Sequence, residues 1–419
     1  MAKFKVGLIG LGTVGTGVFK TLQNFDDVEV VKIAVKNINK KRDIDNFDES
    51  IMTTDPFEIV NNPDIDILVE VIGGVNPAFD LISKAIENGK HIVTANKELL
   101  AKRGKELFEI AEKHNKVILY EAAIAGGIPL IMPIKTIMAG NKINKIRAIL
   151  NGTTNYILTK MDVDGASYED VLKEAQELGY AETDPTGDVE GFDAAYKITT
   201  LSTISFGKRV DINKVYREGI TKVRAEDMQK ANELGYKIKL VAVGNLDQNG
   251  KADVRVHPML VSKNSSLAHI DYVTNSVCLS GFPVGDIAFS GPGAGEFPTA
   301  SSVVGDILNI VEGLKHSEYI LPMMRCHHKE NADMIDISET YNKYYISITA
   351  PNNKGVIGKI GNVCANKNIS LASILQKGVS NDNTAEITVI TEICREKDIQ
   401  DAIKELSDCK INSLIRVEI

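Results

Sequence analysis

A glycine-rich turn near the start of the chain constrains the fold more than any other feature. The run Gly10-Leu11-Gly12-Thr13-Val14-Gly15 directly follows the apolar stretch Lys5–Ile9 and precedes a segment with helical periodicity. Glycines at this spacing allow a tight turn, a close approach of backbone to a pyrophosphate, and anion binding at a helix N-terminus. A merely compact turn is the alternative. The strand–turn–helix context favours a dinucleotide site formed by Gly10, Gly12, Thr13, Val14 and Gly15.

Strand and helix patterns alternate through the first third of the chain. The predicted strands are Phe4–Ile9, Val28–Val35, Ile67–Val71, Ile92–Val93 and Val117–Tyr120. The predicted helices between them are Thr13–Asn24, Pro77–Asn88 and Glu98–His114. This alternation is typical of a parallel, doubly wound α/β sheet of the Rossmann type. We assign residues 1–131 to this domain and expect a helix near 298–320 to complete it.

After about Met132 the pattern becomes α+β. It predicts strands near Ile143–Leu150, Lys237–Leu246, Asp253–Val261 and Asp286–Ser290, and helices near Asn155–Met161, Tyr168–Leu178 and Asp193–Phe206. Residues 132–297 therefore form a second domain. The stretch 329–343 is polar and poor in apolar residues, which predicts a linker. Residues 344–419 then follow the order βαββαβ, which predicts a ferredoxin-like sandwich.

Composition excludes several classes of protein. The chain has 419 residues, of which 43% are hydrophobic, enough for more than one core. Its net charge is -8 and it has no dense basic run, which argues against nucleic acid as a partner. We find neither a signal-peptide h-region nor an apolar stretch long enough for a membrane span.

The cysteines indicate a reducing environment. All five are widely spaced and none forms a C-x-x-C pair, so a disulfide framework or a zinc ribbon is not predicted. The cytoplasm is the expected location. The cluster Arg325-Cys326-His327-His328 has metal-ligating side chains but no acid at helical spacing beside it. We interpret it as a polar domain edge.

The sequence gives a mixed indication of cofactor preference. A Rossmann site selective for NAD usually has an acid about 20 residues beyond the glycines, to bind the ribose 2′-OH. No acid occurs in Ile33-Ala34-Val35-Lys36-Asn37, and Lys40-Lys41-Arg42 follows shortly. Lys36 and these cations favour NADP. They could equally form a solvated loop, so use of both cofactors stays open.

A lysine begins the helix after the fourth strand. Thr94-Ala95-Asn96-Lys97 lies at the carboxyl end of that strand, where open α/β sheets bind their ligands. A cation at a helix N-terminus opposes the helix dipole. This unfavourable position indicates a role for Lys97 facing nicotinamide or substrate.

An acidic stretch precedes a strongly apolar helix. Five carboxylates lie between Glu182 and Asp193, and Lys197 is the one charged residue in Ala194–Gly207. Lys197 follows Asp193 by four residues and so shares its helical face. A lysine withdrawn from water has a lowered pKa, which suits it to donate a proton near neutral pH. The alternative is a structural Asp–Lys pair that joins two domains.

Two strand-to-helix junctions add free backbone N–H groups. They are Asn151-Gly152-Thr153-Thr154-Asn155 and the run from Gly291 to Ser302. Taken singly, each is an ordinary loop.

Together these motifs resemble the homoserine dehydrogenases of the monofunctional kind, which carry a C-terminal ACT domain. The resemblance covers essentially the whole chain. The stretches that carry it are Gly10–Gly15, Thr94–Lys97, Glu121–Pro129, Asn151–Asn155, Glu182–Lys197 and Gly291–Asp306. The stretch ending in Asp193-Ala194-Ala195-Tyr196-Lys197 is the most specific of them.

The resemblance implies an NAD(P)H-dependent reduction of L-aspartate 4-semialdehyde to L-homoserine, in threonine, methionine and isoleucine biosynthesis. Lys197 matches the family's proton donor, Asp193 its orienting partner, and Lys97 a residue between nicotinamide and substrate. The implied substrate residues are Glu182, Asp188, Tyr180, Asn151, Gly152 and Thr153. The implied further cofactor residues are Thr94, Gly293, Gly295 and Thr299.

The resemblance also implies a sodium or potassium ion, a dimerisation role for residues 132–297, and an amino-acid effector such as threonine. The ion would be bound mainly by backbone oxygens of Glu121, Ile124, Gly126 and Ile128. The effector would contact Asn352, Gly355, Val356 and Gln376. The family usually has an Asp and a Pro in this ACT loop, where this chain has Asn352-Asn353-Lys354-Gly355. We expect a homodimer or homotetramer.

Two alternatives come from other classes of protein. A different Rossmann semialdehyde or oxo-acid reductase would share Gly10–Gly15 but should lack the Glu182–Lys197 array. A non-catalytic sensor of dinucleotide and amino acid would have no need of a proton donor such as Lys197. An aldehyde panel assayed with NADPH separates the three.

Overall fold

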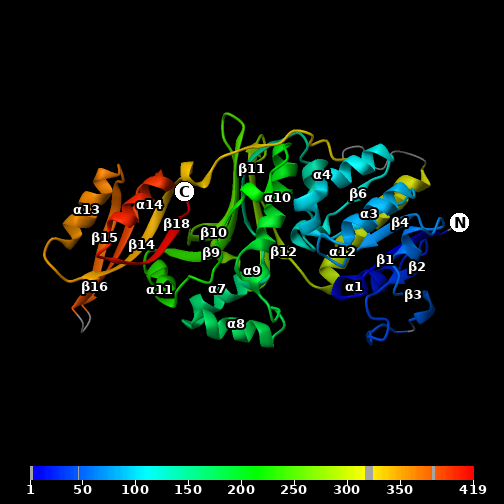
Figure 1. Ribbon diagram of the computed structural model, residues 1–419, viewed down its shortest axis with the longest axis horizontal. Coiled ribbons are helices and arrows are strands. Elements are labelled where there is room, and N and C mark those ends of the chain that lie inside the picture. Colours follow the sequence, from blue (N-terminus) through cyan, green and yellow to red (C-terminus); the bar gives the residue numbers. More distant parts are fainter. Residues whose placement is uncertain (1–2, 46, 317–323, 380–382) are drawn as a thin grey trace. The chain divides into compact units, whose positions relative to one another are not determined.

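The computed structural model describes residues 3–45, 47–316, 324–379 and 383–419 (Figure 1). The chain divides into two compact units. The first comprises the chain up to Ile146 together with Asp193–Asn213 and Thr274–Ala332. The second comprises Arg147–Phe192, Lys214–Val273 and Asp333–Ile419.

The first unit is built on a parallel sheet of six strands in the order β3-β2-β1-β4-β5-β6. The strands are β1 (Phe4–Ile9), β2 (Val28–Ala34), β3 (Met52–Thr53), β4 (Ile67–Glu70), β5 (His91–Thr94) and β6 (Ile118–Leu119). The helices among them are α1 (Thr13–Leu22), α2 (Phe57–Val60), α3 (Ala78–Glu87), α4 (Lys97–Lys113) and the 3-10 turn η1 (Glu49–Ile51). The strand order reverses between β1 and β4, which creates the crevice where doubly wound sheets bind dinucleotides. The predicted Rossmann-type sheet is confirmed.

The first unit is completed by segments from further along the chain. They are α5 (Ala122–Ala125), α6 (Ile131–Lys135), α10 (Phe192–Phe206), β11 (Thr274–Phe282), β12 (Gly285–Pro292) and α12 (Glu296–Lys315). Helix α12 lies along α1, and a Cβ on Gly17 would come within 2.6 Å of the Glu296 carbonyl oxygen. Residues 317–320 of the predicted 298–320 helix lie outside the described residues. Strand β11, which pairs antiparallel with β12, was not predicted.

Strand β7 (Lys142–Ile149) leads from the first unit into the second. The second unit contains β8 (Tyr216–Arg217), β9 (Tyr236–Leu246) and β10 (Lys251–Ser262), with β9 antiparallel to β10. Its helices before the C-terminal region are α7 (Gly152–Asp164), α8 (Tyr168–Glu177), α9 (Thr186–Val189), α11 (Ala225–Glu233) and the 3-10 turn η3 (Ser266–His269). A further 3-10 turn, η2 (Ile212–Lys214), precedes β8.

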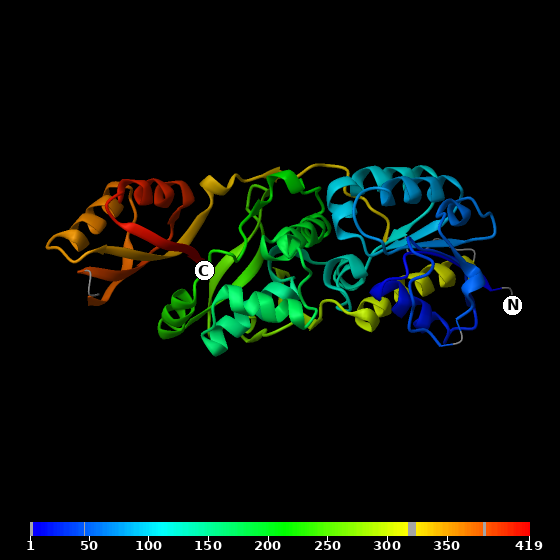
Figure 2. The same ribbon diagram turned by 60° about the horizontal axis from the view of Figure 1, so that its bottom comes forward.

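The C-terminal region has the predicted βαββαβ order. It consists of β14 (Tyr341–Pro351), α13 (Val356–Asn366), β15 (Leu371–Val379), β16 (Thr384–Thr391), α14 (Glu396–Glu405) and β18 (Lys410–Val417), with the short β17 (Cys394–Arg395) before α14. The antiparallel sheet has the order β18-β14-β16-β15, and both helices lie along one of its faces (Figure 2). Ile346 and Ile348 of β14 pack there with Ile360 of α13 and Ile399 of α14. Strand β18 also pairs with β10, which joins this sheet to the rest of the second unit.

The structure differs from the prediction of a linker over 329–343. Residues Asp333–Met334 form β13 beside β10, Ile337–Glu339 form the 3-10 turn η5, and β14 begins at Tyr341. The buried side chains of Thr340 and Asn342 bind the Arg255 guanidinium at 3.0 and 2.8 Å. Two polar residues of this stretch are therefore buried where a cation from a neighbouring strand satisfies their oxygens.

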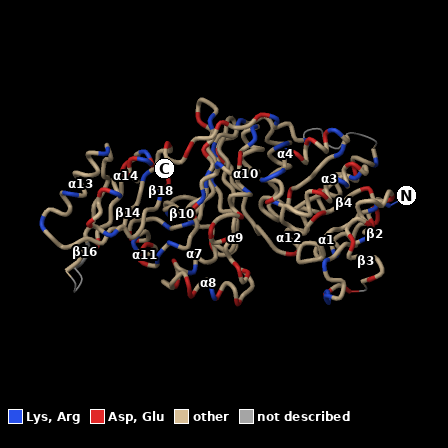
Figure 3. Tube along the Cα trace, viewed as in Figure 1, with Lys and Arg blue, Asp and Glu red and all other residues tan. Residues whose placement is uncertain are grey.

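Acidic and basic residues are interspersed along the described trace (Figure 3). Within the described parts of the chain, no helix has both the length and the apolar character needed to cross a membrane. The described residues also contain no group of three His, Cys, Asp or Glu that could hold a metal ion. In the Arg325–His328 cluster, the Cys326 sulfur lies 2.9 Å from Arg209 Nη2.

Candidate active site

Each glycine of the first turn has a different structural role. Gly10 has a φ of +108°, which L side chains rarely adopt. A Cβ on Gly15 would lie 2.1 Å from the Gly10 carbonyl oxygen, so this glycine allows the helix to pack on the turn. Gly12 is the N-cap of α1, and no heavy atom among the described residues would lie within 4 Å of its Cβ. The turn is therefore open beside Gly12 at the N-terminus of α1, where first-turn N–H groups suit an anion.

A buried carboxylate organises the ends of β4 and β5. Glu70 accepts hydrogen bonds from the Thr94 hydroxyl at 2.7 Å and from the backbone N–H groups of Ile72 and Gly73 at 2.9 and 3.1 Å. Burial raises the pKa of Glu70. Asn96 lies beside it and caps α4 through Leu99 N–H. Glu70 was not among the predicted site residues. An acid at the end of an apolar strand is a sequence pattern that could have indicated it.

Three charged side chains meet in the first unit. Asp193 Oδ1 lies 2.5 Å from Lys97 Nζ, and Asp193 Oδ2 lies 2.8 Å from Lys197 Nζ. The side chains of Asp193 and Lys197 are 7% and 10% exposed, whereas that of Lys97 is 44% exposed. The i,i+4 spacing predicted the pair on α10, but not the contact with Lys97. Two ammonium groups beside one buried carboxylate place positive charge where it can stabilise developing negative charge on a ligand.

The loop after β6 contains a buried acid pair. The Glu121 carboxylate accepts the backbone N–H groups of Leu130, Ile131 and Met132 at the start of α6, and Glu121 N–H donates to Asp306 at 2.8 Å. Burial and the neighbouring charge of Glu121 hold the pKa of Asp306 well above its usual range. Amide N–H groups take up three of the four acceptor positions of the Glu121 carboxylate, and the other side chains of residues 121–128 have no oxygen, so backbone oxygens are the main ligands that this loop offers. The Gly126 carbonyl already accepts the Ser302 hydroxyl at 2.7 Å.

The segment that precedes α12 approaches this loop closely. A Cβ on Gly126 would lie 2.4 Å from the Gly293 carbonyl oxygen. Gly295 has a φ of +123° and caps α12, whose backbone carries the buried Thr299 in its first turn. The predicted cofactor residues Gly293, Gly295 and Thr299 thus form one turn at a helix N-terminus.

Most of the predicted substrate residues gather at the start of α7 in the second unit. Asn151 caps the helix through Thr154 N–H and donates to Asp188 at 2.7 Å. The Thr153 hydroxyl donates to the Tyr180 carbonyl at 2.7 Å. Gly152 begins the helix, and a Cβ there would lie 3.0 Å from the Val273 carbonyl oxygen. Glu182 follows Tyr180 by two residues and is exposed.

The cations after β2 fall into two classes. Arg42 donates to the carbonyl oxygens of Asn37 and Lys40 at 2.9 and 2.7 Å, so its charge holds its own loop. Lys36, Lys40 and Lys41 are exposed. Any attraction for a 2′-phosphate therefore rests with these lysines.

Three of the predicted effector residues lie between the end of β14 and the start of α13, and the fourth, Gln376, lies in β15. Gln376 Nε2 lies 3.3 Å from Asn352 Oδ1. Gly355 has a φ of +93° and caps α13, which begins at Val356. The turn forms with Asn352-Asn353-Lys354 in place of the acid and proline of the family pattern.

Comparisons with known proteins decide the family. Residues 129–308 match the family model described as homoserine dehydrogenase, residues 10–121 match its NAD binding domain, and residues 344–410 match the ACT domain. The chain is 43% identical to the homoserine dehydrogenase of Synechocystis sp., with 99% of each chain covered. The chain belongs to the homoserine dehydrogenase family. It is thus an NAD(P)-dependent oxidoreductase that acts on CH–OH groups.

Solved structures agree with this assignment. The homoserine dehydrogenase of Thiobacillus denitrificans has a TM-score of 0.93 and 38% identity, covering 100% of this chain and 99% of that one. A hyperthermophilic archaeal homoserine dehydrogenase in complex with NADPH has a TM-score of 0.64 and 28% identity, covering 74% of this chain and 98% of that one. The fold and the nicotinamide cofactor predicted from the sequence are therefore confirmed.

Proposed function

We propose that the chain reduces L-aspartate 4-semialdehyde to L-homoserine through Lys97, Asp193 and Lys197. The observation that carries this proposal is the pair of lysine ammonium groups on the one buried carboxylate. Reduction of an aldehyde builds negative charge on its oxygen, and a cation with a proton to donate must meet that charge. The nicotinamide cofactor supplies the hydride when bound.

Lys197 is the proton donor in this proposal. Asp193 accepts from Lys197 at 2.8 Å and fixes the direction of its Nζ, so that one of its remaining protons can go to the alkoxide oxygen. Lys97 holds the second oxygen of Asp193 and adds positive charge near the same point. The new C–H bond comes from the hydride, the new O–H bond from Lys197, and solvent returns the proton to the lysine.

Asn151, Gly152, Thr153, Tyr180, Glu182 and Asp188 are proposed to bind the substrate's amino-acid portion. Glu182 and Asp188 are acids suited to an ammonium group, and the N-terminus of α7 is suited to a carboxylate. The hydrogen bond between Asn151 and Asp188 supports their joint role.

A sodium or potassium ion fits the Glu121–Ile128 loop. Its proposed ligands are backbone oxygens of Glu121, Ile124, Gly126 and Ile128, and such oxygens suit a hard cation. The buried Glu121 carboxylate lies in the same loop and supplies negative charge that a cation would offset.

We propose NADP(H) as the preferred cofactor, because the loop after β2 has three exposed lysines and no acid at the strand end. The archaeal relative solved with NADPH supports the choice. We further propose threonine as an effector at Asn352, Gly355, Val356 and Gln376, and a homodimer or homotetramer as the assembly. Gly355 begins a helix whose N-terminus suits an amino-acid carboxylate.

One steady-state assay tests these proposals together. L-Aspartate 4-semialdehyde is reduced with NADPH or NADH, at low and high salt, in sodium, potassium or N-methylglucamine chloride, with and without L-threonine. We expect NADPH to be preferred and to be weakened more by salt, since exposed charges are screened. No turnover with either cofactor refutes the activity. A preference for NADH refutes the cofactor proposal, and equal rates without alkali cations refute the ion site. A rate that does not respond to threonine refutes the effector proposal. Sedimentation of the same protein as a monomer would refute the assembly.

A further inference from the structure

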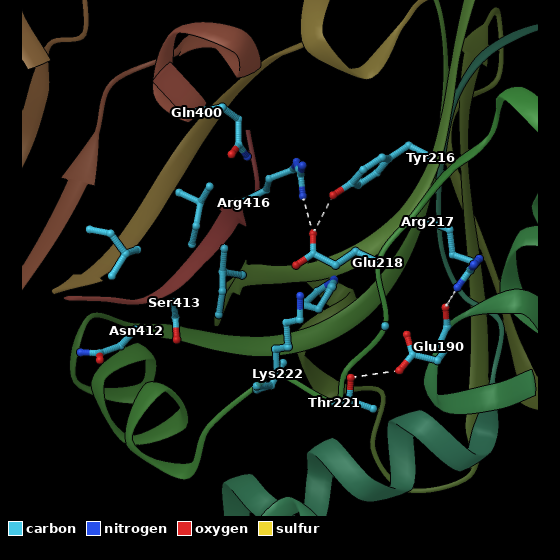
Figure 4. A pocket seen from close by; sticks show the side chains of 16 residues that line it. Glu190, Tyr216, Arg217, Glu218, Thr221, Lys222, Gln400, Asn412, Ser413 and Arg416 are labelled. Carbon is cyan, nitrogen blue, oxygen red and sulfur yellow. Dashed lines mark hydrogen bonds and ion pairs between the residues drawn. The ribbon is translucent and has the colours of Figure 1, made fainter. Parts of the chain in front are cut away.

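A cavity of about 460 Å³ is lined by residues of the second unit, and Lys97, Asp193 and Lys197 are not among them. One wall comes from Asn412, Ser413 and Arg416 of β18 and from Gln400 of α14 (Figure 4). The opposite wall comes from the segment between Tyr216 and Val223. The cavity therefore lies between strand β18 of the C-terminal sheet and the segment 216–223.

The cavity contains a carboxylate with one oxygen still available. Glu218 Oε2 accepts from Arg416 Nη1 at 3.0 Å and from the Tyr216 hydroxyl at 3.1 Å (Figure 4). Both contacts use the same oxygen, so Oε1 can accept from a ligand. A second carboxylate, Glu190, also lines the cavity. Its Oε1 accepts from the Thr221 hydroxyl at 3.0 Å.

The same wall contains an available cation. Lys222 lines the cavity, and its Nζ forms no ion pair with any residue that the structure describes. Arg217 is already engaged, because its guanidinium lies over the Phe192 ring and donates to the Glu190 carbonyl. Apolar side chains, among them Val223 and Ile411, complete the lining.

We propose that this cavity binds a small neutral α-amino acid. Its ammonium group matches Glu218 Oε1, its carboxylate matches the Lys222 ammonium, and a short side chain matches the apolar lining. A phosphate or a nucleotide would meet the carboxylates of Glu190 and Glu218, and an apolar ligand would leave the charged groups without partners. The site shares no residue with the Asn352–Gly355 turn.

Occupation of this cavity acts on the acidic stretch. Ile220 N–H donates to the Val189 carbonyl at 2.8 Å, and a Cβ on Gly219 would lie 2.3 Å from that carbonyl oxygen. The segment that contacts the ligand is therefore in close backbone contact with the residue after Asp188. A ligand that moves this segment changes the position of Asp188, and hence the KM for the semialdehyde. This kinetic consequence rests on the proposed function, whereas the binding does not.

Isothermal titration of the full chain tests the binding. The probes are L-threonine, L-serine and L-valine, with isobutylamine and isovalerate as valine analogues that each lack one charge. We expect at least one amino acid to bind and both analogues to fail. Lys222→Ala and Glu218→Gln should each weaken that binding at least about tenfold, because each removes a charge-assisted contact.

Two further variants locate the site. Lys214→Ala removes an exposed lysine that does not line the cavity and should leave binding unchanged. Asn352→Ala should remove only L-threonine bound at the turn of residues 352–356, and should leave unchanged the binding that depends on Lys222 and Glu218. The proposal is overturned if no amino acid binds, if both analogues bind as well as valine, or if binding survives Lys222→Ala and is lost in Asn352→Ala. A protein that binds the amino acid but does not reduce the semialdehyde refutes only the proposed function.

Discussion

Two buried carboxylates, Asp193 in the first unit and Glu396 in the second, are each surrounded by donors of a different kind. Asp193 contacts one lysine through each oxygen. Glu396 accepts from two guanidinium nitrogens of Arg416 at 2.9 and 2.8 Å, from the Tyr344 hydroxyl at 2.7 Å and from Gln400 at 3.0 Å.

The difference separates a cluster that suits chemistry from one that stabilises the fold. Four donors saturate the Glu396 carboxylate, so neither of its oxygens can accept from a ligand. Arg416 also contacts Glu218 through one oxygen of that carboxylate. In the Asp193 cluster two ammonium groups share one carboxylate, and the side chain of Lys97 is partly exposed. Positive charge near the surface can meet a substrate, whereas removing one partner of a saturated buried pair destabilises the fold.

The largest expected effect comes from breaking the saturated cluster. Glu396→Ala leaves the Arg416 guanidinium buried beside an empty volume, which should cost about 3–5 kcal/mol of unfolding free energy. The measurement is urea denaturation. Glu405→Ala on the same helix removes only an exposed contact with Lys367 and should cost less than about 1 kcal/mol. Folded Glu396→Ala enzyme should keep its kcat. A loss of kcat without a loss of stability would show that the Glu396 cluster serves catalysis rather than the fold.

The second effect is kinetic. Lys197→Ala should lower kcat at least about 100-fold, equivalent to roughly 2.7 kcal/mol of activation free energy, because no proton donor then meets the alkoxide. Its unfolding free energy should change far less than that of Glu396→Ala. Lys105→Ala, which removes an exposed lysine on α4, should keep full activity. A Lys197→Ala variant with nearly normal kcat would make the Asp193 cluster a structural one too.

The sequence predicts one of these clusters in part and does not predict the other. Asp193 and Lys197 lie four residues apart on an otherwise apolar helix, so local periodicity reveals their pair. The contact of Lys97 with Asp193 depends on the tertiary fold, and no local pattern encodes it. Glu396 begins a helix among other charges and Arg416 alternates with apolar residues in a strand, so both have the pattern of surface positions. Both are buried in the structure, where Arg416 lies on the part of β18 that pairs with β10.

The same distinction applies to the fold. Parallel strands that are buried on both faces are apolar runs, so β1, β2, β4 and β5 were predicted close to their observed limits. Strand β11 alternates small polar and apolar residues in Thr274–Phe282 and was missed. The stretch 329–343 looked like a linker because it is mostly polar, and the contacts of its buried Thr340 and Asn342 with Arg255 follow no local pattern.

The smallest expected effect removes a single donor from the saturated cluster. Tyr344→Phe deletes the hydroxyl that donates to Glu396 but leaves the ring in its fully buried position. Because Arg416 and Gln400 still satisfy the carboxylate, the loss of unfolding free energy should be about 1–2 kcal/mol, well below that of Glu396→Ala. Tyr341→Phe, on an exposed ring of the same strand, should stay within about 0.5 kcal/mol of the parent protein. If Tyr344→Phe costs as much as Glu396→Ala, the donors act as one cooperative network, and saturation by independent contacts is the wrong description of this cluster.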